Sequence, residues 1–93
     1  MRYITKVKKA GYGEYFITVA DTENVKPTVT AKLERFEGDR EVQWQIGLPV
    51  KNTYPPYAVA YDFNDAVGHP TKKSAIWWTQ REGVHIDEHT VVD

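Results

Sequence analysis

The sequence contains no cysteine. Disulfide bonds, thiolate metal ligands and thiol nucleophiles are therefore excluded as sources of stability or of chemistry. Small secreted domains usually depend on disulfides, so the absence of cysteine favours a reducing compartment, and we expect a cytoplasmic location.

Long apolar runs are also lacking. No stretch of about 18 apolar residues is present, so the sequence predicts no transmembrane helix. The N-terminal residues alternate charged with apolar types, which is unlike a secretory signal peptide. We therefore expect no membrane partner.

A strong net charge is absent too. The formal net charge is −1, which provides no general attraction to nucleic acid or to acidic lipid. The charges are nevertheless unevenly distributed: residues 1–10 carry four basic residues and no acid, whereas residues 82–93 carry four acids and no lysine or arginine. The simplest interpretation is that the two ends lie close together and partly neutralise each other.

What the sequence does contain indicates a folded domain. Hydrophobic residues make up 41% of the chain and aromatic residues 13%, unlike the composition of disordered segments. A chain of 93 residues supports one core, so we expect a single globular domain over residues 1–93. Three Trp, six Tyr and three Phe are more rings than the centre of so small a core can hold, and some of them must lie at its edge.

Several short segments rich in β-branched and aromatic residues alternate apolar with polar side chains, which is typical of half-buried strands. These segments are residues 2–8, 15–20, 41–46, 57–63 and, near the end of the chain, 84–86. Glycines at 11 and 13 predict a turn that joins the first two strands into a hairpin. Residues 47–56, which include three prolines, are expected to be irregular.

Residues 28–36 fit two structures. The apolar residues here are spaced by four, four and three positions, which places them on one face of a helix: Val25, Val29, Leu33 and Phe36. The same stretch also contains the alternation Val29, Ala31, Leu33 and the β-branched run 28–30, both of which favour a strand. We favour the short helix and keep the strand as the alternative.

A second helix is predicted over residues 71–82. Thr71 can cap its N-terminus and Gly83 can end it. Lys72 and Lys73 in the first turn oppose the helix dipole, so a strand stays open here as well. The expected fold is therefore α+β: a small, mainly antiparallel sheet of four or five strands with one or two short helices on one face. An all-β barrel is the alternative if both ambiguous segments are strands.

Trp77 and Trp78 are the residues most informative about function. Adjacent side chains diverge by about 100° on a helix and point to opposite faces on a strand, so both indoles cannot occupy the centre of one small core. At least one indole is expected at the surface, where an aromatic side chain commonly anchors a partner. Tyr54 and Tyr57 can extend such a patch if the fold brings them close. The alternative interpretation is that one indole is core and the other only covers its edge.

Basic and aromatic residues near the N-terminus suggest a second class of partner. Arg2, Lys6, Lys8 and Tyr12 have the chemistry of a platform for single-stranded nucleic acid. The alternative interpretation is that basic side chains protect an edge strand from aggregation.

The segment His85-Ile86-Asp87-Glu88-His89 matches the His-x-x-Glu-His spacing of some zinc proteases. That motif needs a helix, which this β-branched, glycine-preceded segment does not favour. On a strand, His85, Asp87 and His89 share one face and could hold a metal weakly. Exposed polar residues near a terminus explain the same pattern without a metal.

The sequence thus favours a non-catalytic module that binds a protein partner or associates with itself, for instance as a homodimer, through an aromatic patch. A single-stranded nucleic-acid binder is the first alternative, and a small metal-binding protein or enzyme is the second. No cofactor is expected.

Overall fold

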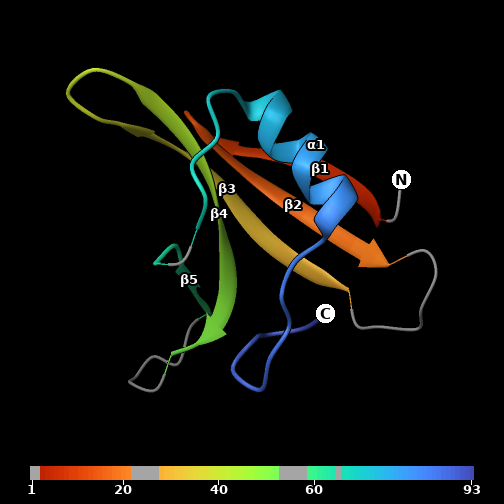
Figure 1. Cartoon of the computed structure of the whole chain (residues 1–93). Coiled ribbons are helices and arrows are strands. Elements are labelled where there is room, and N and C mark those ends of the chain that lie inside the picture. Colours follow the sequence, from red (N-terminus) through yellow and green to blue (C-terminus); the bar gives the residue numbers. More distant parts are fainter. Residues whose placement is uncertain (1–2, 22–27, 53–58, 65) are drawn as a thin grey trace.

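Five antiparallel strands and one helix make up the part of the chain that the computed structural model describes, which is residues 3–21, 28–52, 59–64 and 66–93 (Figure 1). The strands are β1 (Tyr3–Gly11), β2 (Glu14–Asp21), β3 (Val29–Glu37), β4 (Val42–Lys51) and β5 (Val59–Asp62), and the helix is α1 (Lys72–Glu82). The strands lie side by side in chain order, β1-β2-β3-β4-β5, and α1 covers one face of the sheet. This confirms the predicted α+β fold. The sheet is open, with β1 and β5 as its edges, so the barrel alternative is wrong.

The first two strands form the predicted hairpin. β1 pairs with β2 from Tyr3, opposite Asp21, to the turn, with a register irregularity just before it. Gly13 adopts a φ of 66°, a conformation that side chains with a Cβ disfavour, which is why glycine ends this turn. The carbonyl of Gly13 accepts a hydrogen bond of 2.9 Å from the amide of Arg35, which ties the turn to β3.

The helix favoured over residues 28–36 is wrong: this segment is β3. Its alternating residues Val29, Ala31 and Leu33 are all buried, and Ala31 and Leu33 pack in the core that includes Ala75 of α1, whereas Phe36 is 37% exposed. β3 pairs with β2 on one side and with β4 on the other, so both neighbours satisfy its backbone groups. The period-two pattern therefore outweighed the helical spacing.

The predicted strand over 41–46 is confirmed but too short, because β4 continues through Lys51 in a stretch expected to be irregular. β4 pairs with β3 as far as Gly47 and with β5 from Leu48 to Lys51. Pro49 has no N–H, and β4 accommodates it because it lies beyond the end of the β3 pairing. The strand predicted over 57–63 is likewise present as the shorter β5, with residues 57 and 58 outside the described ranges.

The short strand predicted over 84–86 is absent. The chain after α1 instead passes back over the sheet and contacts β4 through an isolated bridge between Thr90 and Val50. The amide of Val91 donates a hydrogen bond of 2.8 Å to the carbonyl of Pro49. This segment, residues 83–93, is called the C-terminal segment below.

The predicted helix over 71–82 is confirmed as α1. The Thr71 hydroxyl accepts a hydrogen bond of 3.0 Å from the amide of Ser74, which is the capping expected from sequence. Gly83 ends the helix with a φ of 71°, and its amide donates to the Thr79 carbonyl over 2.8 Å. Within the described ranges, no helix has the length and apolar character needed to cross a membrane.

The main core lies between α1 and the sheet. Its enclosed side chains come from β2, β3 and α1, and partly buried side chains surround them. The enclosed residues are Ile17, Val19, Ala31, Leu33 and Ala75, and the surrounding residues are Tyr3, Tyr15, Trp44, Ile46, Leu48, Ile76 and Val84. Burial of these apolar side chains stabilises the helix on the sheet.

A smaller aromatic cluster lies on the opposite face of the sheet. The rings of Phe36 and Phe63 meet edge to face with their centroids 5.3 Å apart, and those of Phe16 and Tyr61 lie 6.1 Å apart. Phe63 rests directly against β4 at Gly47, where a Cβ atom would lie 2.6 Å from its ring. The absence of a side chain at this buried position is what lets the ring approach the strand.

This contact gives a first prediction. Gly47→Ala should lower the free energy of unfolding by about 1–3 kcal/mol, because the added methyl overpacks the Phe63 ring. Gly38→Ala is the matched control: a Cβ there would lie 3.4 Å from its nearest neighbour at an exposed position, so a change below about 0.5 kcal/mol is expected. Urea titrations would measure both values. Equal destabilisation by the two variants would contradict the described packing.

Candidate functional site

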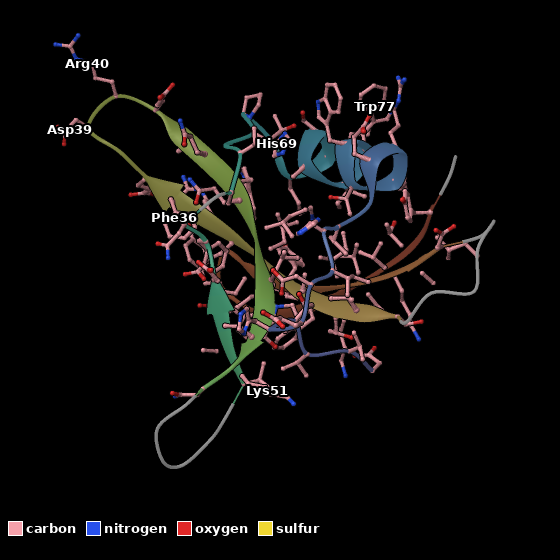
Figure 2. All side chains as sticks on the ribbon, turned by 60° about the horizontal axis from the view of Figure 1, so that its bottom comes forward. Phe36, Asp39, Arg40, Lys51, His69 and Trp77 are labelled. Carbon is pink, nitrogen blue, oxygen red and sulfur yellow. The ribbon has the colours of Figure 1, made fainter. Side chains whose placement is uncertain are left out.

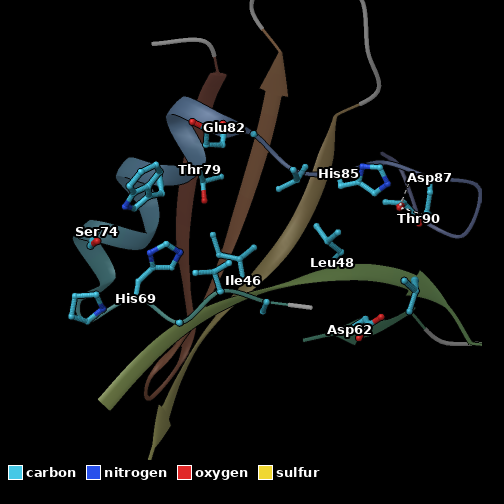
Figure 3. Close-up of a pocket in the computed structure, with 18 residues that line it drawn as sticks. Ile46, Leu48, Asp62, His69, Ser74, Thr79, Glu82, His85, Asp87 and Thr90 are labelled. Carbon is cyan, nitrogen blue, oxygen red and sulfur yellow. Dashed lines mark hydrogen bonds between the residues drawn. The ribbon is translucent and has the colours of Figure 1, made fainter. Parts of the chain in front are cut away.

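A half-open cavity of about 710 Å³ lies between α1, β4 and the C-terminal segment (Figure 3). Its floor is a row of alternate β4 side chains, Ile46, Leu48 and Val50. These residues share the face of the sheet that carries the main core, but α1 does not cover them completely. The cavity is therefore an extension of the core that stays open to solvent.

Three walls surround this floor. The α1 wall is made by Ser74, Trp78, Thr79 and Glu82; the loop wall by residues 66–70 with Asp62; and the third wall by Gly83, Val84, His85, Asp87 and Thr90 of the C-terminal segment. The volume is within the range of pockets that bind small molecules or side chains. Apolar groups line most of the floor, and polar groups lie along the walls.

Hydrogen bonds within a tight turn hold the C-terminal wall in place. The Asp87 carboxylate accepts from the amide of His89 at 2.8 Å and from the Thr90 hydroxyl at 3.2 Å. The first of these bonds is the main cause that lowers the pKa of Asp87, since it favours the charged carboxylate. Asp87 is therefore an anion at neutral pH.

His69 lies at the junction of the loop wall and the floor. Its backbone pairs with Trp44 through two hydrogen bonds, 2.7 Å and 2.9 Å long, which fix the loop against β4. Its imidazole lies on the same side as Ile46 and the α1 wall (Figure 3). Burial disfavours the charged ring and lowers the pKa of His69 below 6.5, so the ring is neutral at pH 7.

Both tryptophans of the predicted patch lie at the surface of α1. Trp77 is 47% exposed and Trp78 is 44% exposed. Their rings meet edge to face, with centroids 5.0 Å apart and planes at 87°, and the Arg81 guanidinium lies 4.8 Å from the centroid of Trp77. Trp77 stands on the outer side of the helix (Figure 2), while Trp78 lines the cavity. We call Trp77, Trp78 and Arg81 the indole cluster. Tyr54 and Tyr57 lie outside the described residues.

The predicted nucleic-acid residues lie elsewhere. Gln80 of α1 donates a hydrogen bond to Thr5 over 2.9 Å, so Thr5 faces the helix and its neighbours Lys6 and Lys8 alternate onto the opposite face of edge strand β1. Tyr12 is 90% exposed in the β1–β2 turn. Arg2 lies outside the described residues. The structure thus separates this set from the cavity and from the indole cluster.

The three predicted metal ligands do not form a cluster. His85 and Asp87 line the cavity, whereas His89 lies beyond it with its ring 3.3 Å from the Glu88 carboxylate. The strand that would have placed all three on one face is absent. In the ranges that the structure describes, no group of three or more His, Asp or Glu side chains could hold a metal ion.

Sequence reasoning missed the cavity itself. Ile46, Leu48 and Val50 continue the alternation of β4, but Pro49 lies among them and two more prolines follow, which favoured an irregular segment over 47–56. His69 and Glu82 gave no signal, because they join the site only through the way the helix and loop fold over β4.

The comparisons with known proteins add no further information. No protein-family model matches the chain, and neither a curated protein nor a solved structure shows significant similarity to it.

The burial of His69 predicts how stability depends on pH. The unfolded chain binds the proton more tightly than the folded one, so the free energy of unfolding should fall as the pH drops below about 6.5. His69→Gln should lose part of this dependence, measured by urea titrations between pH 7.5 and 5.5. An unchanged profile in His69→Gln would rule out this role.

Proposed function

We propose that this domain is a non-catalytic module that binds another protein through the indole cluster. The observation that carries the proposal is the unusual orientation of α1. The helix buries Ala75 and Thr79, two small residues, and leaves its two largest side chains about half exposed. A helix that serves only to cover a core normally does the reverse.

The ring geometry of the cluster is suited to binding. Trp77 and Trp78 support each other edge to face, and Arg81 lies over the outer ring one helical turn further on. These contacts restrain the side chains before a partner arrives, which reduces the conformational entropy lost on binding. Tryptophan and arginine are also the residue types that most often dominate the affinity of protein interfaces.

The hydrophobic gain available here is large for so small a surface. An indole buries up to roughly 200 Å² or more, so the exposed halves of two indoles offer about 200 Å² together, or about 5 kcal/mol at 25 cal/mol per Å². The fold does not use this free energy, since the indoles stay exposed in the isolated chain. A partner that covers both rings would use it.

A peptide-display selection tests this proposal. Wild-type protein should enrich peptides that bind at least tenfold more weakly to Trp77→Ala and to Trp78→Ala, because each change removes half of the ring pair. Tyr12→Ala is the matched control, since it removes a more exposed aromatic ring from the distant β1–β2 turn and should leave affinity unchanged. Calorimetry on the enriched peptides would give the affinities, and circular dichroism would confirm that each variant is folded.

The contrary outcomes are clear. Peptides that bind the double variant lacking both indoles as tightly as the wild type would refute the proposal. Sedimentation of the wild-type chain tests whether the partner is a second copy of the chain. A dimer that Trp77→Ala dissociates and Tyr12→Ala does not would identify the partner as a second copy.

A further inference from the structure

Acidic side chains line the cavity beside Trp78. Its described lining residues include three carboxylates, Asp62, Glu82 and Asp87, and two histidines, but no lysine or arginine. The ion pairs among the described residues join Lys32 to Glu14 and Glu34, Arg35 to Glu37, and His89 to Glu88, so none of them involves a cavity carboxylate. Among the described residues, no ion pair joins a lysine of β1 to these acids, although the Tyr3 ring lies against Gly83 at the end of α1.

Two cations of α1 lie against aromatic rings instead of the cavity carboxylates. On α1, Lys72 places its ammonium group 4.3 Å from the ring centroid of Tyr15, and Arg81 lies over Trp77. Asp62 accepts a hydrogen bond of 2.9 Å from the amide of Asn64, which orients the carboxylate without cancelling its charge. The cavity thus combines fixed negative charge with an indole ring, and both attract cations.

The shape of the floor indicates an extended occupant. Ile46, Leu48 and Val50 are alternate residues of one strand, so the apolar row is about 13 Å long at roughly 3.3 Å per residue. This length exceeds that of one small cation and matches an extended segment of about four residues. The cavity is half open to solvent, so such a segment can enter it from outside.

We propose that the protein partner lays a short extended segment along this cavity, with a lysine or arginine side chain directed at the acidic walls and apolar side chains on the β4 floor. This inference rests on the proposed function, because Trp78 belongs to both the indole cluster and the cavity wall. It goes further by assigning the chemistry of the bound segment: basic, and flanked by apolar residues.

Three synthetic peptides test the assignment. The basic probe is acetyl-Ala-Leu-Lys-Leu-Ala-amide, and its two analogues replace the lysine with norleucine, which keeps the four-carbon chain but lacks the ammonium group, or with glutamate. In nuclear magnetic resonance titrations at low salt, the basic probe should bind at least tenfold more tightly than either analogue and should lose affinity as salt is added. The largest shifts should fall on the amides of Leu48, Val50 and Val84 and on the indole N–H of Trp78.

Charge reversal at the wall provides the matched variants. Glu82→Lys should weaken binding of the basic probe at least tenfold and bring its affinity close to that of the norleucine analogue. The exposed position and the favourable placement of a cation at a helix C-terminus should keep this variant folded. Glu41→Lys makes the same change of charge at an exposed site outside the cavity and should bind the basic probe as the wild type does.

Each outcome separates this inference from the proposed function. Equal affinity for the lysine and norleucine probes, or wild-type affinity in Glu82→Lys, would overturn the basic segment while leaving binding through the indole cluster intact. Binding of the basic probe in the cavity, together with peptide selections insensitive to both tryptophans, would uphold the cavity and overturn the indole cluster. A wild-type dimer that Glu82→Lys dissociates would show that the occupant belongs to a second copy of the chain, and would overturn the assignment to a separate partner.

Discussion

The close packing of α1 on the sheet is the constraint on which the rest of the structure depends. Ala75 is fully enclosed among side chains of β2 and β3, and the Thr79 hydroxyl donates to the Ala75 carbonyl over 2.8 Å, so this polar group is satisfied within the helix itself. Small residues at the contact bring the helix close to the strands. Large side chains cannot enter that contact, so Trp77 and Trp78 must occupy the flank and the outer side of the helix.

The same packing explains where the cavity opens. α1 covers the middle of the sheet, but β4 runs beyond the end of its pairing with β3 and carries its apolar alternation with it. The C-terminal segment crosses this part of β4, held by the bridge between Thr90 and Val50, without filling the space beside the helix. Because α1 is short and β4 is long, part of β4 extends beyond the helix. The apolar floor, the acidic walls and the Trp78 ring therefore meet at this place. The indole cluster and the cavity are two parts of one surface, joined at Trp78.

Much of this fold could be predicted from local sequence signals. Thr71 and Gly83 marked both ends of α1 correctly, and alternation located the strands that flank the hairpin turn. β3 was mispredicted because Val29 and Leu33 satisfy the helical period as well as the strand period, and only pairing with two neighbours decides between them. The exposure of an indole followed from the geometry of adjacent residues, which is local. The cavity could not be predicted from local geometry, because Leu48, His69 and Glu82 meet only through tertiary packing.

Solvent access to the three indoles tests the account most directly. Photochemically induced nuclear polarisation by a dissolved flavin dye reports which aromatic rings solvent molecules can reach. The account predicts strong polarisation of Trp77 and Trp78 and weaker polarisation of Trp44, which packs against the main core. Signals from Trp77 and Trp78 no stronger than that of Trp44 would mean that the isolated chain already encloses both rings. The helix would then be oriented differently, and no aromatic surface would be left for a partner.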